Sequence, residues 1–344
     1  MDLLSIIKNK QFNFDNIKIA VIGDCMLDVY HYGNVDRISP EAPVPIFQIN
    51  NKEPEYRLGG ACNTALNLSK LGIETSLFGF VGKDIGATYI KTYLLENNIE
   101  YRLIDVSNFP TITKNRYFSK SQQIIRIDQE YSNKIIKDIE KQNKLIKSFG
   151  KFLNNLSNPF NAVIFSDYGK GTLVYPVLRE IKEICQKLCI PIFIDPKINN
   201  WKEYKGAFCI TPNWYEFKYV CHNPDIQINS DVNIIAACAG EICREFDLEY
   251  ILITRGAQGM LLADKEGEPI TIGTETKEIY DVSGAGDTVI AVFAAAHAKE
   301  FSKIIGMQLA NLAAKVVIGK LGTYAITNSE LSLEMLNYNK EGGL

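Results

Sequence analysis

The feature that most limits how this chain can fold is a regular alternation of short apolar runs and longer helix-like stretches after residue 162. The short runs are rich in Val, Ile and Phe, and apolar residues recur at helical spacing in between. This rhythm predicts a parallel sheet covered by helices on both faces. The expected strands are 163–166, 192–194, 208–211, 250–254 and 259–263, and the expected helices are 174–189, 214–219, 234–246, 288–299 and 303–317.

The first 130 residues predict more of the same sheet together with a second, smaller one. An amphipathic helix is expected over 1–16, strands at 18–23 and 75–81, and helices at 61–71 and 87–97. Two segments differ, since prolines exclude a helix from 29–50 and β-branched residues alternate in 101–128. We expect these two to form one antiparallel lid sheet inserted into a single domain over 1–330, with 331–344 as a C-terminal tail.

Composition narrows the class of protein. With 344 residues, 46% of them hydrophobic, the chain can bury the core of one large α/β domain. The net charge of −3 gives no basic footprint for nucleic acid. Without an apolar run of about 20 residues or a secretory leader, we expect a cytoplasmic protein that binds no membrane. The eight cysteines form no C-x-x-C pair and predict buried free thiols rather than disulfides or a metal centre.

Polar residues cluster where several of the expected strands end. Ligands of open α/β sheets bind beyond the carboxyl ends of the strands, so such clusters together indicate a site. They are found at 23–28, 166–168, 195–197, 211–213 and 254–256.

A turn of small residues at 283–286 runs into the apolar segment 289–298, which we expect to be a buried helix. The amide groups at a helix N-terminus suit an anion such as phosphate. A carboxylate there, Asp287, would be repelled by phosphate unless it takes a proton from a hydroxyl that attacks phosphorus. The alternative is that Asp287 merely caps the helix, because Asp is a favoured N-cap residue.

Two motifs together resemble the paired signatures of the PfkB (ribokinase-like) carbohydrate kinases. They are Gly-Gly-Ala-x-Asn-x-Ala at 59–65 and Asp-x-Ser-Gly-Ala-Gly-Asp-Thr at 281–288. The resemblance covers about residues 17–330 and implies a ribokinase-like three-layer sandwich with a central, mostly parallel sheet and a small β-sheet lid. Val282 replaces the family's usual Thr, which removes a hydroxyl but keeps every backbone amide of the turn.

Further stretches resemble the heptose-7-phosphate kinases within that family. They lie at 23–28, 37–45, 110–114, 166–171 and 319–323. This resemblance implies ATP-dependent phosphorylation of the C1 hydroxyl of D-glycero-β-D-manno-heptose 7-phosphate, a step toward the heptose of the lipopolysaccharide core. Many such kinases are fused to an adenylyltransferase domain, and the length of this chain implies a stand-alone kinase.

The resemblance also implies roles for individual residues. Asp287 would be the general base, and the backbone amides of Gly284, Ala285 and Gly286 would form the anion hole. The family's N-x-x-E element is matched by Asn213, Trp214, Tyr215 and Glu216, which would bind the nucleotide. Asn213 would face its phosphates, and Glu216 would position Mg²⁺ through water. Thr254 and Gly256 would lie near the ATP phosphates and Asn311 near the adenine. Alternatively, Glu216 is an ordinary first-turn glutamate and Asn311 an ordinary polar helix residue.

For the sugar, Asp28 and Asn63 would bind hydroxyls, and Gly59 and Gly60 would let the backbone approach the ring. A sugar phosphate also needs cations, for which the candidates are Lys114, Arg116, Arg126 and Lys197. Solvated surface charge is the alternative for each. The strand-end residues Asp167, Lys170 and Asp195 could contact substrate or metal, or support the structure.

Two other functions and one assembly are compatible with the same sequence. The chain could phosphorylate an unphosphorylated sugar such as ribose or fructose, or it could be a non-catalytic nucleotide or sugar sensor. A Rossmann dehydrogenase is excluded because no G-x-G-x-x-G follows the strand at 18–23. The apolar alternation in 44–49 and 101–128, with the resemblance, predicts a homodimer formed through the lid sheet.

Overall fold

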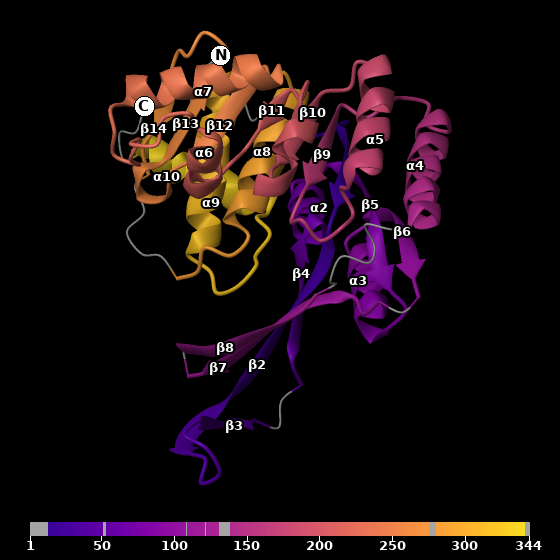
Figure 1. The fold of residues 1–344 in the computed structure, drawn as a ribbon, viewed down its shortest axis with the longest axis vertical. Coiled ribbons are helices and arrows are strands. Elements are labelled where there is room, and N and C mark those ends of the chain that lie inside the picture. The colour runs from indigo at the N-terminus through magenta and orange to yellow at the C-terminus, as the bar shows by residue number, and fades with distance from the viewer. Residues whose placement is uncertain are drawn as a thin grey trace.

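A computed structural model describes residues 13–50, 53–107, 109–120, 122–130, 138–274 and 280–340, so nearly all of the helix expected over 1–16 lies outside the described residues. A nine-stranded sheet forms the centre of the main body (Figure 1). In spatial order its strands are β14 (Ile270–Ile272), β13 (Met260–Ala263), β12 (Tyr250–Thr254), β11 (Cys209–Ile210), β10 (Ile192–Asp195), β9 (Ala162–Ser166), β1 (Lys18–Gly23), β5 (Glu74–Gly82) and β6 (Glu100–Val106).

All neighbouring strands from β12 to β6 are parallel, and only β12–β13 and β13–β14 pair antiparallel. The expected mostly parallel sheet is therefore confirmed. Its carboxyl edge collects the ends of β1, β9, β10 and β12, as the strand-end clusters predict.

Helices cover both faces of this sheet and bury two separate cores. In β1, Ile19 and Val21 point into one core while Ala20 and Ile22 point into the other. The first core is closed by α2 (Ala61–Lys70), α3 (Ile85–Glu96), α8 (Ala285–Ala298), α9 (Lys303–Ile318) and α10 (Asn328–Lys340). The second is closed by α4 (Ile139–Asn154), α5 (Tyr175–Lys187), η2 (Ile198–Tyr204), α6 (Trp214–Val220) and α7 (Val232–Phe246). The result is a three-layer sandwich.

A second sheet of five strands projects from the body as an extended arm (Figure 1). It orders β3 (Pro45–Ile49), β2 (Cys25–Ile38), β7 (Ile112–Ser119) and β8 (Gln122–Gln129), with β4 (Glu55–Gly60) also paired to β2. We call this sheet the lid. It is mixed rather than antiparallel, because β2 and β7 run parallel over eight residue pairs.

The structure corrects three expectations about the secondary structure. Residues 101–106 belong to β6, the edge strand of the main sheet, because α3 returns the chain parallel to β5 in a βαβ unit. Gly59 and Gly60 end the lid strand β4 instead of forming a turn. Residues 331–340 are not a tail but lie in α10, with Leu331 and Met335 buried in the first core. Helix α4 and strand β14 were not predicted.

Seven of the eight free cysteines are buried, as expected, and Cys189 is exposed. Within the described part of the chain, no helix combines the length and the apolar character that crossing a bilayer would require.

The docking of α10 can be tested by removing its buried leucine. We expect Leu331→Ala to lower the free energy of unfolding by about 3 kcal/mol, because a fully buried leucine leaves a cavity. Leu333 lies on the same helix but is 59% exposed, so Leu333→Ala should change stability by less than about 0.5 kcal/mol. Equal effects of the two substitutions in chemical denaturation would contradict the docked helix.

Candidate active site

The site is organised around the first turn of α8, where Asp287 is buried with 2% of its surface exposed. The N-cap of this helix is Gly284, in the left-handed conformation with φ 81°, and Asp287 lies three residues further on. The alternative role of Asp287 as the helix cap is therefore wrong. Its side chain is instead hydrogen-bonded to two other elements.

Three side chains donate hydrogen bonds to the Asp287 carboxylate. Asn63 Nδ2 reaches Oδ2 at 2.8 Å, whereas Thr64 Oγ1 reaches Oδ1 at 3.0 Å. Both come from the first turn of α2. The third donor is the hydroxyl of Tyr168, 2.8 Å from Oδ1, which comes from the loop after β9. Asn63, expected to bind a sugar hydroxyl, thus holds the candidate base in the observed structure.

A second buried carboxylate fixes the loop that carries Tyr168. Asp24 follows β1 and is fully buried, and its side chain accepts hydrogen bonds from the backbone amides of residues 168, 170 and 172 at 2.9–3.0 Å. Asp167, in the same loop, accepts hydrogen bonds from Asn200, Tyr204 and the amide of Gly169. Of the three roles that the sequence leaves open for Asp167, these contacts favour support of the structure.

Burial and hydrogen bonding act in opposite directions on the acidity of these groups. Burial raises the pKa of Asp287, while the donors Asn63, Tyr168 and Thr64 and the nearby Lys114 lower it. Burial also raises the pKa of Asp167 to about 6, with a further contribution from the charge of Asp24. The pKa of Lys114 is lowered by its own burial, against the attraction of Asp28 and Asp287.

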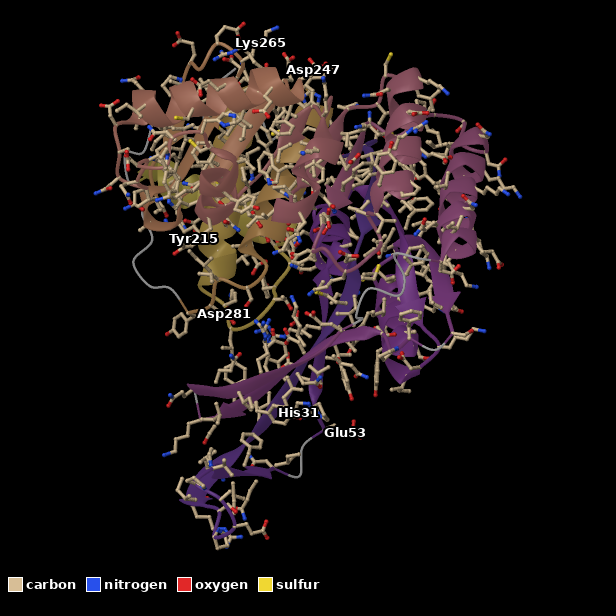
Figure 2. The ribbon with its side chains drawn as sticks, viewed as in Figure 1. His31, Glu53, Tyr215, Asp247, Lys265 and Asp281 are labelled. Carbon is tan, nitrogen blue, oxygen red and sulfur yellow. The ribbon has the colours of Figure 1, made fainter. Side chains whose placement is uncertain are left out.

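Lys114 connects the lid to the main body. It lies on β7, directly opposite Asp28 on β2, and its Nζ sits 5.2 Å from the centre of the Tyr168 ring. In Figure 2, Asp281 lies on the edge of the body that faces the lid, while Asp247 and Lys265 lie at the opposite edge. The site therefore lies between the lid and the carboxyl ends of the strands.

Asp28, Arg116 and Arg126 lie on the same lid face as Lys114, and these residues and Lys170 of the main body already have protein partners. Asp28 forms a buried ion pair with Arg116, with contacts of 3.0 and 3.2 Å. Burial nevertheless raises the pKa of Asp28. Arg126, opposite Arg116 in the sheet, pairs with Asp128 at 2.8 Å. Lys170 pairs with Glu130, at the end of the lid strand β8.

A cavity of about 290 Å³ adjoins the N-terminus of α8. Five of the expected nucleotide and anion-hole residues line it, namely Thr254, Gly256, Ala285, Gly286 and Asn311. Its remaining wall is mostly apolar, formed by Met260, Val282, Val289, Ala314 and Ile318 among others. Asn311 donates from Nδ2 to the carbonyl of Gly273 at 3.0 Å. An apolar slot with a few polar groups beside a helix N-terminus suits a purine ring followed by phosphates.

The N-x-x-E element is not part of that cavity wall. Asn213 and Glu216 form a reciprocal capping box at the start of α6, with hydrogen bonds of 3.0 Å in both directions. Trp214 is a core residue packed near Phe217, which corrects its expected nucleotide contact. Tyr215 is 81% exposed and lies on the surface of the body (Figure 2).

A group of carboxylates lies between Glu216 and Asp287. Asp195, at the end of β10, has a pKa raised well above its usual range by burial and by the charges of Asp287, Glu216 and Asp167. Lys197 opposes this shift. A divalent cation would reverse the repulsion, so these oxygen donors fit Mg²⁺. Among the described residues, no group of three His, Cys, Asp or Glu side chains could hold a metal ion by itself.

Sequence reasoning did not assign Thr64, Tyr168 or Asp24 to the site. Asp24 and Tyr168 both lie in strand-end clusters, so their position was visible, but their partners depend on how three distant segments meet. Thr64 follows Asn63 inside the first motif and carried no separate signal.

The backbone at Gly284 gives a stability test of the turn. We expect Gly284→Ala to lower the free energy of unfolding by about 1–3 kcal/mol, because φ is positive and a Cβ would lie 2.7 Å from Nδ2 of Asn63. At Gly286 a Cβ meets nothing within 4 Å, so Gly286→Ala should be neutral or stabilise by up to about 1 kcal/mol. Thermal unfolding of both variants checks the contrast, and an unaffected Gly284→Ala variant would contradict this turn.

Curated relatives resemble nearly the whole chain. The "Bifunctional protein HldE" of Actinobacillus pleuropneumoniae serotype 5b (strain L20) is 37% identical over 333 residues, covering 96% of this chain and 66% of the relative. HldE of Haemophilus influenzae (strain PittEE) is 37% identical over 324 residues, covering 92% and 63%. The chain thus spans just under two thirds of the length of these relatives.

Solved structures and a family model agree on the fold. Phosphofructokinase-2 from Escherichia coli, in complex with substrates and products, superposes with a TM-score of 0.75 at 15% identity, covering 94% of this chain and 99% of the other. This likeness shows a common ribokinase-like fold. The model of the pfkB family of carbohydrate kinases matches residues 16–330. The chain belongs to the pfkB family of carbohydrate kinases and is an ATP-dependent sugar phosphotransferase.

Proposed function

We propose that this enzyme phosphorylates the C1 hydroxyl of D-glycero-β-D-manno-heptose 7-phosphate, using ATP, to give the 1,7-bisphosphate. This reaction would serve the synthesis of ADP-heptose for the lipopolysaccharide core. Two kinds of support carry the choice of sugar: the identity of 37% to the HldE proteins over most of this chain, and the cations on the inner face of the lid.

The cations are what an already phosphorylated sugar requires. Lys114, Arg116 and Arg126 share one face of the lid, and the charges of both arginines act on the Lys114 ammonium. Arg and Lys side chains at this spacing can bind a phosphate dianion at the far end of a sugar whose C1 faces Asp287. Lys197 lies apart from them, beside Asp195 and Glu216, which suits the nucleotide phosphates.

The single observation that carries the mechanism is the buried carboxylate at the N-terminus of α8. The Asp287 carboxylate would take the proton of the C1 hydroxyl as its oxygen attacks the terminal phosphorus of ATP. The amides of Gly284, Ala285 and Gly286 would stabilise the charge on the transferred group. The ring oxygen makes this hydroxyl more acidic than an ordinary alcohol, so a carboxylate is an adequate base.

ATP and Mg²⁺ would occupy the sites already described. The cavity beside α8 would take the nucleotide, and Glu216 with Asp195 would hold the cation directly or through water. Bound there, Mg²⁺ supplies positive charge that offsets the charge of the phosphates. Burial raises the pKa of Glu216, which the backbone amide of Asn213 partly counteracts.

We expect purified protein to consume ATP with D-glycero-D-manno-heptose 7-phosphate and not with sedoheptulose 7-phosphate, fructose 6-phosphate, ribose or fructose. Asp287→Asn should lower turnover at least about a hundredfold, because general base catalysis contributes roughly that much. Asp105→Asn is the matched control: this carboxylate lies on β6, the edge strand of the main sheet, and pairs with Lys91 of α3, so the substitution should leave turnover unchanged. Coupled ADP release measures all three proteins.

The other outcomes distinguish the remaining candidates. Turnover of ribose or fructose alone would keep the kinase mechanism and overturn the heptose substrate. An Asp287→Asn variant as active as wild type would overturn the base. Binding of nucleotide and sugar without turnover of any sugar would favour a sensor.

We propose that the enzyme is a homodimer formed through the outer lid face, opposite the cationic one. On that face His31 and Phe47 pack on Tyr117, with ring centres 4.4 and 5.3 Å apart. Ile125, directly opposite Tyr117 in the sheet, and Ile127 are half exposed at 51% and 49%. An apolar, aromatic sheet face of this kind is stabilised when a second copy covers it.

If the outer lid face forms the dimer, lysine substitutions on that face should convert the dimer to a monomer. At micromolar concentration, sedimentation should give twice the chain mass for wild type and one chain mass for a variant with Ile125→Lys and Ile127→Lys. Ile139→Lys, an equally drastic change at an exposed position on α4, should remain dimeric. A wild-type monomer under these conditions would remove the proposal.

A further inference from the structure

Tyr168 is a half-buried group at the site, and the catalytic scheme above gives it no task. The loop that carries Tyr168 is held in place by hydrogen bonds. The backbone amides of every second residue in this loop, at 168, 170 and 172, donate hydrogen bonds to the carboxylate of Asp24. Because Asp24 is fully buried and follows β1 directly, the loop is tied to the centre of the main sheet.

The position of the ring is constrained from its other side as well. Lys114 of the lid lies over the ring face, 5.2 Å from its centre. A cation over the face of a phenol draws electron density from it and makes its O–H a stronger donor. The hydroxyl keeps its proton: burial, and then the charge of Asp287, raise the pKa of Tyr168 well above its usual range. Tyr168 is therefore a hydrogen-bond donor to Asp287 throughout the working pH range.

The hydrogen bonds divide unequally between the two oxygens of Asp287. Oδ1 accepts from both Tyr168 and Thr64, whereas Oδ2 accepts from Asn63 alone among the residues that the structure describes. A carboxylate oxygen has two lone pairs directed in its plane. The two donors therefore use both lone pairs of Oδ1, whereas the one donor to Oδ2 leaves a lone pair there, on a residue with 2% of its surface exposed.

We infer that Tyr168 is a positioning residue: with Thr64 it saturates Oδ1 of Asp287, so that Oδ2 is the oxygen that receives the proton of the acceptor hydroxyl. This inference rests on the proposed kinase reaction for its chemical step. There the hydroxyl O–H bond breaks and its proton passes to Oδ2, while the hydroxyl oxygen bonds to the γ-phosphorus of ATP. The bond from that phosphorus to the β,γ-bridging oxygen breaks, and ADP leaves with the electron pair. Tyr168 neither gains nor loses a proton.

A pH profile separates this role from a merely structural one. The acid limb of kcat/KM reports protonation of the free enzyme's base. Tyr168→Phe removes a donor that favours the ionised carboxylate, so the limb should move to higher pH. Relative to wild type, we expect kcat/KM of Tyr168→Phe to fall about tenfold at pH values below the wild-type acid limb. On the pH-independent plateau it should fall less than about threefold. A structural defect would lower activity by the same factor at every pH.

Tyr324→Phe is the matched control. The Tyr324 hydroxyl also donates to a carboxylate, Oε1 of Glu330, at 2.7 Å, but it does not contact Asp287. This variant should leave the acid limb where wild type has it. An unmoved limb in Tyr168→Phe, or an equal shift in both variants, would overturn the inference.

A second measurement needs no turnover and keeps the two proposals apart. Burial raises the pKa of Asp287 in the folded protein above its value in the unfolded chain. The protonated carboxyl therefore contributes to the free energy of unfolding at low pH, and this contribution is lost as the pH rises through the folded pKa. Tyr168→Phe raises that folded pKa further. Its cost in unfolding free energy should therefore grow as the pH rises through the folded pKa of Asp287. In a protein that also carries Asp287→Asn, the same cost should not vary with pH.

Wild type, Tyr168→Phe, Asp287→Asn and the double variant together form a double-mutant cycle. A cost of Tyr168→Phe that is independent of pH with Asp287 intact would overturn the positioning role, whatever the enzyme phosphorylates. A pH-dependent cost in a protein that turns over no sugar would keep the positioning role and overturn the proposed kinase reaction.

Discussion

The site depends on one energetically unfavourable feature, the burial of the Asp287 carboxylate in the first turn of α8. An isolated buried charge of this kind costs several kcal/mol, and removing a single donor from it costs a further 1–3 kcal/mol or more. Donors from α2 and from the loop after β9 offset that cost, together with the positive end of the α8 dipole and the Lys114 ammonium. The carboxylate thus fixes how α2, α8 and the central strands meet.

The lid is continuous with the elements that hold this carboxylate. Asp24 is the one residue between β1 of the main sheet and β2 of the lid, and the lid strand β4 ends at Gly60, one residue before α2 begins. The loop at 319–323 ties the lid to the anion-hole turn from the other side. Arg57 of β4 donates to the carbonyls of Leu321 and Thr323, and the amide of Gly322 donates to Asp281. Lid, base and turn are therefore parts of one connected structure.

The sequence predicted the layers, the position of the site and the helix that begins at the glycine-rich turn, because each has a local signal. Apolar runs define the buried strands, and strand-end polar residues define the edge where ligands bind. Residues 101–106 were misassigned because an edge strand of the main sheet alternates in burial as a lid strand does. The role of Tyr168 and the capping of Glu216 depend on side-chain contacts, which spacing alone does not encode.

The proposed chemistry depends most directly on one atom, Oδ2 of Asp287. A crystal structure with D-glycero-D-manno-heptose 7-phosphate and a non-hydrolysable ATP analogue tests it. We predict the C1 hydroxyl oxygen within hydrogen-bond distance of Oδ2, about 2.6–3.2 Å, with Tyr168 and Thr64 still bonded to Oδ1. A C1 hydroxyl bonded to Oδ1 in place of Tyr168, or one that faces away from Asp287, would contradict the account.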